Sequence, residues 1–405
     1  MNLLIFCSNP VNGGTVRIFL ELTKYFKNNM TEHDRVFSAT NINNPAVMYD
    51  EIKDIYKINV LSETELFDNQ CNHNYLLRIL NKISRYLRYR KTYKQNIEEM
   101  KKFLKDNRID CVLIHNGGYV GDDLCNQLLK ASFECSDQVK GRLFVLHSDF
   151  EKSFLSKIRY RFYDNFLCRT STELITVSNY TKKRLIENSY INKDIEVLYN
   201  GLPERNTLGL EEKHKMISVD EKQNNVLMLG NFQHNKGQLV FIDVIKRILL
   251  NCSNVKFTFI GNIYDEAYYR KCIDEIKKGN LSNVITIYSG INNASEYIDL
   301  FDVLAVTSIY DESFGLISVE AMSKITPVVA FACGGIQEVV NDGVSGYVVP
   351  IGDVQKMAEK IIEILNNEDL KSTLGKNGRK EYDNRFSVKA MGERYYKMIE
   401  KYRNP

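Results

Sequence analysis

The chain has 405 residues, of which 44% are hydrophobic and 26% charged, and its formal net charge is +3. This composition is typical of a globular protein and excludes an intrinsically disordered one. The length suits two domains of about 200 residues each, and since no run approaches ~18 consecutive apolar residues, the sequence predicts no membrane-spanning helix.

The cysteines and the opening residues suggest a cellular compartment. The nine cysteines form no C-x-x-C pair, and several lie in apolar runs, which is typical of buried, reduced thiols in the cytoplasm. The opening MNLLIFCSNP has no basic leader, so no signal peptide is expected. We expect a cytoplasmic protein that at most lies on the inner face of the cell membrane.

The first predicted elements are a strand, a glycine turn and a helix. LLIFC (3–7) is a short apolar run, SNPVNGG (8–14) is the turn, and TVRIFLELTKYF (15–26) has apolar residues at helical spacing. This order of elements opens a nucleotide-binding α/β unit.

The next long element is basic. Residues 76–108 hold eleven Lys and Arg against three Asp and Glu, with apolar residues at helical spacing among them. The pattern fits a solvated helix packed by one face, and it also fits an amphipathic surface for anionic lipid. No recognition motif accompanies the charge, so nucleic acid is not an expected partner.

Continuous apolar runs then recur along both halves of the chain. In the first half they are 110–118, 141–149 and 173–181; after a loop-rich segment at 196–225, they are 226–230, 255–262, 284–291, 302–308 and 326–335. Runs without strict alternation predict parallel strands that are buried on both faces. At 226–250, strand, glycine turn and helix recur as in the opening residues.

The sequence therefore predicts an α/β protein of two Rossmann-like, doubly wound domains that face each other across a cleft. The first domain is expected at 1–200 and the second at 201–386, with a helix in 387–405 that packs back on the first. Ligands bind beyond the carboxyl ends of such strands. Neither a P-loop nor a G-x-G-x-x-G fingerprint is present, so ATPase and dehydrogenase activities lose their usual support.

Two glutamates flank a predicted helix start in DESFGLISVEAM (311–322). A helix that begins near Gly315 leaves unpaired backbone N–H groups that attract an anion. Glu312 then lies just before the helix and Glu320 inside it, where both can accept hydrogen bonds from hydroxyl groups. The alternative is that Glu312 only complements the helix dipole and that Glu320 is an exposed helix residue.

This segment resembles the E-x-F-G-x-x-x-x-E motif of glycosyltransferase family 4, whose members are retaining enzymes of the GT-B fold. The segment after it, TPVVAFACGGIQEVVNDGVSGYVVP (326–350), is also similar to the family's pattern. Further matches follow along the chain: NGG at 12–14, VLHSD at 145–149, TVSNYT at 176–181, YNG at 199–201 and G-x5-KG at 230–237.

The resemblance implies roles for residues of the second half. Lys236 would neutralise the donor diphosphate, Glu320 would hold the ribose hydroxyls and Glu312 the hydroxyls of the donor sugar. Backbone amides would cradle the diphosphate or sugar at Phe314, Gly315 and Leu316. Glu338, after the Gly-Gly pair, would contact sugar or cap the next helix.

The resemblance implies fewer roles for residues in the first half of the chain. Gly13 and Gly14 would let their loop close on the phosphate and the acceptor. His147 would lie near the reacting carbon, and His115, at the end of another strand, is a weaker candidate for the acceptor site.

One residue departs from the family pattern. Members commonly carry arginine directly after the glycine at the strand end, where this chain has Asn231. Asparagine donates hydrogen bonds but has no charge, so the diphosphate would depend on Lys236 and helix dipoles, or on a basic residue elsewhere. No D-x-D pattern is present, so we expect neither a metal nor a cofactor.

The resemblance implies a metal-independent glycosyltransferase of the hexosyltransferase type. Its donor would be a nucleotide sugar, most simply a UDP-sugar, and its acceptor a glycan or a polyprenyl-linked glycan in cell-surface polysaccharide assembly. Three alternatives remain: a glycoside hydrolase using two carboxylates, a nucleotide-sugar epimerase, and a degenerate relative that binds a partner or acts as a scaffold.

Overall fold

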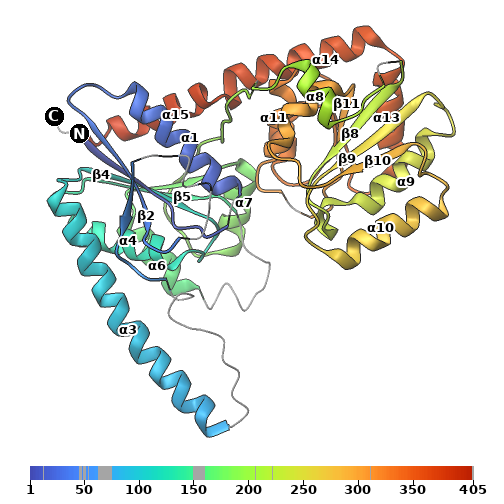
Figure 1. Cartoon of the computed structure of the whole chain (residues 1–405). Helices are drawn as coiled ribbons and strands as arrows, with labels where there is room; N and C mark the ends of the chain where they lie inside the picture. The colour runs from blue at the N-terminus through green and yellow to red at the C-terminus, as the bar shows by residue number, and fades with distance from the viewer. Residues whose placement is uncertain are drawn as a thin grey trace. The chain divides into compact units, whose positions relative to one another are not determined.

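The chain folds into two compact units in the computed structural model (Figure 1). Unit 1 comprises Met1–Tyr199 and Met391–Pro405, and unit 2 comprises Asn200–Ala390. The structure describes residues 1–11, 13–44, 48, 52, 54–62, 75–148, 160–205, 207–220, 222–310 and 312–403, with side chains of the helix that starts at residue 75 described from residue 87 onward.

Unit 1 is built on a seven-stranded sheet of order β3-β2-β1-β4-β5-β6-β7, in which all described pairings are parallel. Its strands are β1 Asn2–Phe6, β2 Arg35–Asn41, β3 Ile55–Ile58, β4 Cys111–Asn116, β5 Gly141–Leu146, β6 Glu173–Thr176 and β7 Ile195–Val197. The order reverses between β1 and β4, so the switch point of this sheet lies beyond the carboxyl ends of these two strands.

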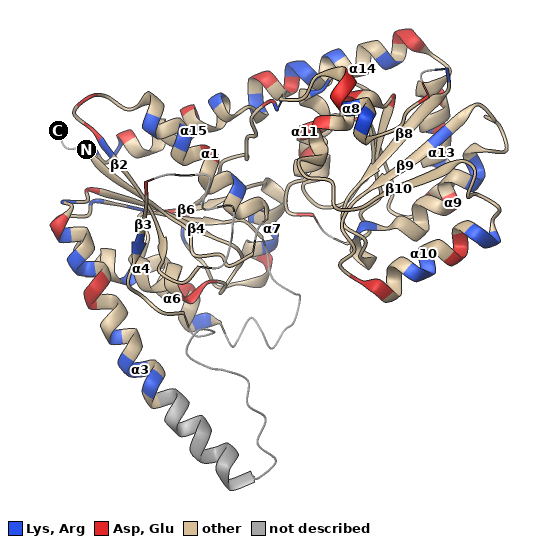
Figure 2. Cartoon of the chain, viewed as in Figure 1, with Lys and Arg blue, Asp and Glu red and all other residues tan. Residues whose placement is uncertain are grey.

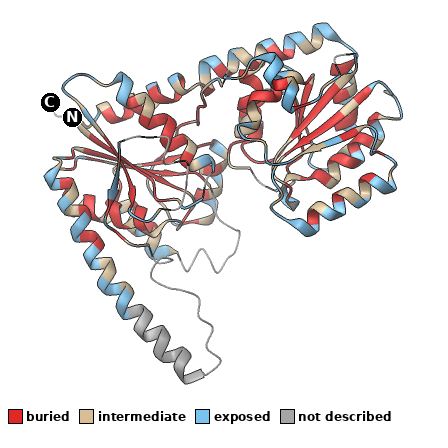
Figure 3. Ribbon diagram, in the orientation of Figure 1, coloured by how far each residue is buried: buried red, intermediate tan, exposed pale blue. Residues whose placement is uncertain are grey.

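Helices cover both faces of the unit 1 sheet (Figures 1 and 3), and its central strands β1, β4 and β5 are therefore buried apart from the half-buried Asn2 and Arg142. They are α1 Gly14–Asn29, α3 Tyr75–Asp106, α4 Asp123–Glu134, α6 Arg161–Thr170 and α7 Asn179–Asn188. The apolar run of β1 and the helical period of α1 predicted from the sequence both appear.

The basic stretch forms the long helix α3 (Figure 2). In its described half, Ile97, Met100 and Leu104 are buried in the core of unit 1, while Arg90 and Lys94 are exposed. This half packs by one face, as predicted. The side chains of 76–86, on which much of the proposed lipid-binding surface depends, lie outside the described residues.

Unit 2 contains a six-stranded parallel sheet of order β10-β9-β8-β11-β12-β13. The strands are β8 Asn224–Leu229, β9 Val255–Ile260, β10 Ile285–Tyr288, β11 Val303–Val306, β12 Val328–Phe331 and β13 Gly346–Val349. Here the order reverses between β8 and β11, and this pair defines the switch point.

The helical segments of unit 2 flank this sheet. Helix α9 packs against α10 and α13, and α11 packs against η3 and α14. Their bounds are α8 Leu210–Met216, η2 His234–Lys236, α9 Gln238–Ile248, α10 Glu266–Lys278, η3 Ala294–Leu300, α11 Leu316–Ser323, α12 Ile336–Val339, α13 Val354–Leu365, α14 Glu368–Glu381 and η4 Tyr382–Phe386.

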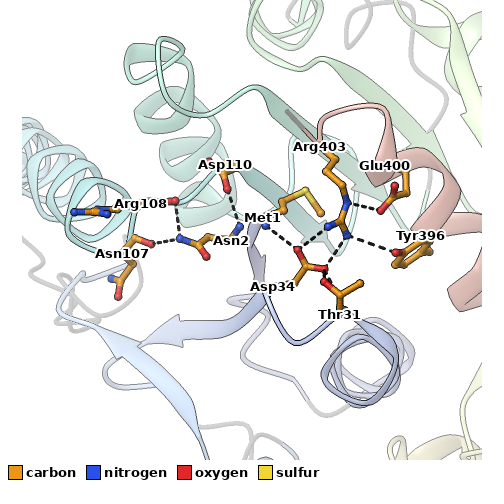
Figure 4. Close-up of polar contacts among 10 residues, drawn as sticks. All are labelled: Met1, Asn2, Thr31, Asp34, Asn107, Arg108, Asp110, Tyr396, Glu400 and Arg403. Carbon is orange, nitrogen blue, oxygen red and sulfur yellow. Dashed lines mark hydrogen bonds and ion pairs between the residues drawn. The ribbon is translucent and has the colours of Figure 1, made fainter. Parts of the chain in front are cut away.

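The last helix, α15 Val388–Glu400, begins in unit 2 and ends in unit 1. In unit 1 the buried ring of Tyr395 lies beside His115, with 6.3 Å between the ring centroids. Beyond the helix, Arg403 donates to both carboxylate oxygens of Asp34, whose side chain is fully buried, at 2.9 and 2.8 Å (Figure 4). The end of the chain is thereby fixed to the loop before β2.

The segment 196–225 contains more regular structure than the sequence indicates. It includes the end of β7 and the helix α8, and Glu296 holds it to unit 2 by accepting from Thr207 N at 2.9 Å and Leu208 N at 3.1 Å. The eight cysteines in the described part of the chain form no disulfide. Among the described residues, no helix combines the length and apolarity needed to cross a bilayer.

Candidate functional site

The switch point of unit 2 brings together the two charged residues on which the prediction depends. Lys236 ends the turn after β8, and Glu312 follows β11, the neighbouring strand. The Lys236 ammonium forms an ion pair with Glu312 Oε1, and the two side chains are 19% and 26% exposed. Lys236 is therefore not the solvated turn residue that its position in a loop allows.

Two hydroxyl residues directly after β11 hold this pair, and the sequence prediction missed both. Thr307 Oγ1 donates to the backbone oxygen of Lys236 at 3.0 Å, and Ser308 Oγ donates to Glu312 Oε1 at 3.0 Å. Gly237 makes the approach possible: its φ is 73°, and a Cβ there would lie 2.1 Å from Thr307 O. In the sequence, these two hydroxyl residues are indicated by the T-S dipeptide that directly follows the apolar run of β11.

The Gly-Gly pair after β12 has a local structural reason. A Cβ on Gly334 would lie 2.1 Å from the backbone oxygen of Glu312, and one on Gly335 would lie 2.4 Å from Ser313 O. Gly335 N also donates to Glu312 O at 2.7 Å. The two glycines thus set the backbone position of Glu312. Glu338, in α12, is half-buried.

Helix α11 begins where the sequence predicts. Gly315 is its N-cap with φ 97°, and no acidic side chain lies in its first turn, so the N–H groups of the first turn meet no carboxylate of their own turn. The Phe314 ring is buried against Phe386, which leaves only its backbone for a ligand. Glu320 is 8% exposed, so the alternative that it is simply a solvated helix residue is wrong.

Asn231 occupies the place where members of the resembled family commonly carry arginine. Its Oδ1 accepts from Asn262 N at 3.3 Å, and its backbone oxygen accepts from Gln238 Nε2 at 2.9 Å. The bond from Asn262 joins the ends of β8 and β9, and the bond from Gln238 joins the end of β8 to the start of α9. The Asn231 side chain therefore has a structural role and brings no charge.

In unit 1, the two predicted histidines are in contact. His115 lies near the carboxyl end of β4, and His147 directly follows β5. His115 Nδ1 lies 2.9 Å from His147 Nε2. Burial lowers the pKa of His147 to about 3, and burial together with the neighbouring His147 lowers the pKa of His115 well below its usual range. Both rings are therefore neutral at pH 7.

The predicted glycines of unit 1 lie at the start of α1. Gly13 is the N-cap in extended backbone with φ −169°, and a Cβ there would have Val11 O as its nearest neighbour, at 3.9 Å. Local geometry therefore does not require glycine at residue 13. Gly14 is the first residue of α1. Among the described residues, no group of three or more His, Cys, Asp or Glu is arranged to hold a metal ion.

Two family models match this sequence. The model for Glycosyltransferase Family 4 matches residues 60–205, and that for Glycosyl transferases group 1 matches residues 210–381. The chain belongs to this family of glycosyltransferases. Its two parallel-sheet α/β units are those of the GT-B fold, and a solved glycosyltransferase from Rickettsia africae has the same fold at 18% identity, with a TM-score of 0.76 over 99% of this chain and 98% of that one.

Curated relatives of this chain are similar to it over part of their length. An uncharacterized glycosyltransferase of Methanocaldococcus jannaschii is 32% identical over 60% of this chain and 64% of its own. A capsular polysaccharide biosynthesis glycosyltransferase of Staphylococcus aureus is 29% identical over 55% of this chain and 60% of its own. The matched stretches thus span less than two thirds of both relatives.

Proposed function

We propose that this chain is a metal-independent, retaining glycosyltransferase that transfers a hexosyl group from a UDP-sugar to a glycan or lipid-linked acceptor. The observation that carries the proposal is the contact between Lys236 and Glu312 beside the start of α11. It combines a cation, a helix N-terminus and a hydroxyl-binding carboxylate at one switch point, which suits a sugar attached to a diphosphate.

The proposed roles follow from the charge that develops in the reaction. As the glycosidic bond breaks, negative charge builds on the leaving nucleoside diphosphate, and Lys236 with the amides of Phe314, Gly315 and Leu316 would stabilise it. Glu312 would bind the donor sugar and Glu320 the ribose. The acceptor would attack from the face that the leaving group vacates, so no carboxylate nucleophile is needed.

The choice of uridine rests on structural relatives. Solved structures of the Anabaena protein HepE contain UDP with glucose and UDP-glucose, at 16% and 18% identity and TM-scores of 0.71 and 0.69. We extend the UDP-sugar donor from that protein to this chain. Because this likeness supports the fold alone, the nucleotide base is a hypothesis for the experiment below.

The proposed acceptor is a cell-surface glycan, as in capsule, exopolysaccharide or lipopolysaccharide-type assembly. The capsular relative and an Escherichia coli O-antigen chain mannosyltransferase, 25% identical over 62% of this chain, support this setting. In unit 1, His147 would face the reacting sugar, and Gly13, Gly14 and His115 would contribute to the acceptor side.

We also propose that unit 1 meets an anionic membrane through the helix within 76–108. Its described half exposes Arg90 and Lys94, and a pocket of about 550 Å³ opens between α3, α4 and α6. The pocket is lined by Tyr93, Lys130, Phe133, Glu134, Phe162, Asn165, Phe166, Arg169 and Thr170. Aromatic walls with two cations suit an anionic lipid head group and the first carbons of its acyl chains.

Liposome co-sedimentation tests the membrane proposal. We expect binding to vesicles containing phosphatidylglycerol, weakened by salt and by the double variant Arg90→Glu, Lys94→Glu. The matched control is Arg270→Glu, Lys271→Glu on the exposed face of α10 in unit 2. Equal binding to neutral vesicles, or equal loss in both variants, contradicts a role for α3.

The donor proposal is tested by thermal shift and by hydrolysis with UDP-, GDP-, ADP- and CMP-sugars in EDTA. We expect UDP-sugars alone to stabilise the chain, and Lys236→Ala and Glu320→Ala to abolish this shift. Lys246→Ala is the matched control, because Lys246 pairs with Asp243 on the outer face of α9. A response that needs a divalent metal contradicts the metal-independent mechanism, and a response to no nucleotide contradicts donor binding.

Asn231 is the specific observation that favours a second candidate, a degenerate relative acting as a binding partner or scaffold. Its side chain is engaged in joining strand ends and supplies no charge to a diphosphate. Nucleotide binding without any turnover would support that function. Isomerisation of the donor without an acceptor would instead support an epimerase.

A further inference from the structure

The contact between His115 and His147 raises the question of which ring nitrogen carries each proton. The two rings lie 5.2 Å apart between centroids, and the single hydrogen bond between them joins His115 Nδ1 to His147 Nε2 at 2.9 Å. Since both rings are neutral, each has one N–H and one bare nitrogen. Only two arrangements of the protons are compatible with this bond.

The surroundings of His115 distinguish the two arrangements. Its other nitrogen, Nε2, is buried and has no hydrogen-bond partner among the described residues. If His147 donated the bond, His115 would have to place its own N–H at this Nε2, where no described residue accepts it. If His115 donates, Nε2 carries only a lone pair. Buried N–H groups without a partner are rarer in proteins than unpaired acceptors.

We propose that His115 is a positioning residue: its Nδ1–H donates to His147 Nε2 and so fixes His147 in the tautomer protonated at Nδ1. His147 then presents an N–H at its remaining ring nitrogen, at the carboxyl end of β5, where it is 8% exposed. It is a hydrogen-bond donor there and has no lone pair with which to accept a proton.

This inference deepens the proposed function and rests on it for its consequence in the reaction. A sugar hydroxyl or a developing oxyanion can accept from His147 Nδ1–H, whereas general-base catalysis by that ring is excluded. The residue would thus select an oxygen acceptor on the sugar or the substrate hydroxyl. His115 contributes without touching either substrate.

The tautomer is measured directly and independently of activity. Protonated and bare ring nitrogens separate in long-range proton–nitrogen correlation spectra of protein labelled with nitrogen-15 histidine, and the chain has only six histidines. Signals are assigned by their loss in His115→Asn and His147→Asn. We expect both His115 and His147 to be protonated at Nδ1. A proton on His147 Nε2 overturns the proposal.

Tyr395 supplies the control for the assumption about His115 Nε2. Its hydroxyl is also buried without a partner among the described residues, and its ring lies 6.3 Å from His115. Tyr395→Phe removes this hydroxyl and leaves the histidine pair intact. We expect unchanged tautomers; a change of tautomer would show that Tyr395 pairs with Nε2 and would overturn the assignment.

Kinetics test the positioning role. In His115→Asn an amide N–H can replace Nδ1–H, whereas His115→Leu has no donor. With UDP release from UDP-glucose or UDP-N-acetylglucosamine as the assay, we expect kcat of the Leu variant to be about tenfold below that of the Asn variant, the equivalent of one hydrogen bond. Equal kcat values in two variants with the same melting temperature contradict the role. If the wild type releases UDP from neither probe, the proposed function fails for these donors, while the spectra still decide the tautomer.

Discussion

Replacing Arg403 with methionine should destabilise unit 1 by about 2–3 kcal/mol. Arg403 makes two charge-assisted hydrogen bonds to Asp34, whose side chain is fully buried, while Arg403 itself is 29% exposed (Figure 4). Removing one partner of a buried pair costs ~3–5 kcal/mol, and the partial exposure of Arg403 reduces this figure. Methionine keeps most of the aliphatic packing, so the loss reports the charge.

The pH dependence gives a second, independent measure of the same pair. Burial alone would raise the pKa of Asp34, but hydrogen bonds from Arg403, the Met1 amino group and Thr31 outweigh it and hold the pKa well below its ordinary value of 3.8. A depressed carboxyl pKa contributes stability that is present above the unfolded value and is lost as the pH falls through the folded value. The stability difference between wild type and Asp34→Asn should therefore be constant from pH 5 to 7 and shrink below about pH 4.

Denaturant unfolding monitored by circular dichroism measures both effects. The control is Lys183→Met on α7 of the same unit, because Lys183 is 76% exposed and pairs with Glu187 only at 3.9 Å; it should cost less than about 0.5 kcal/mol. If Arg403→Met were no more destabilising than Lys183→Met, or if the Asp34→Asn difference grew on acidification, the buried-pair reasoning would be refuted.

Three further changes test unit 2. Gly237→Ala should unfold or strongly destabilise the unit, by more than about 3 kcal/mol, because the new Cβ would meet Thr307 O at 2.1 Å with φ at 73°; chemical denaturation measures this. Asn231→Arg should lower the Kd for UDP roughly fivefold, because it adds a cation near the diphosphate. Calorimetry measures this Kd, and a higher value in the variant would contradict a diphosphate site beside residue 231. Glu296→Gln should cost about 2 kcal/mol by weakening its bonds to Thr207 and should speed proteolysis within 200–209; an unchanged rate would show that Glu296 does not hold this segment.

Several of the strands predicted from the sequence bury apolar residues on both faces. Strands β8 and β12 are of this kind, and their continuous apolar runs need no knowledge of their neighbours. Strand β2 was missed because Ser38, Thr40 and Asn41 are buried in it. Burial of these polar side chains depends on partners elsewhere in the chain, such as Asn44, which donates to Thr40 Oγ1 at 2.9 Å. Hydrophobic periodicity carries no trace of such pairing.

For the site, the sequence predicted residue types and local geometry but not which residues meet. The glycine at the start of α11 and the spacing of its glutamates are local, so a dozen residues are enough to predict them. The contact of Lys236 with Glu312 joins residues 76 positions apart and depends on β8 and β11 being neighbours, which the strand order decides.

The strand order also places the residues that hold Lys236 and Glu312 by hydrogen bonds. Thr307 and Ser308 directly follow β11, and Thr307 lies against Gly237 in the turn after β8. The Thr307 hydroxyl donates to the backbone oxygen of Lys236, and the Ser308 hydroxyl donates to the carboxylate of Glu312. A long lysine side chain usually loses conformational freedom when it binds a ligand. Here Glu312 already restricts the ammonium group of Lys236. A diphosphate that replaces the Glu312 carboxylate as the partner of Lys236 therefore gains charge complementarity at a smaller cost in side-chain entropy. Glu312→Gln should therefore weaken nucleotide binding even though the substitution removes a negative charge beside the phosphate, whereas simple electrostatic repulsion requires it to strengthen binding.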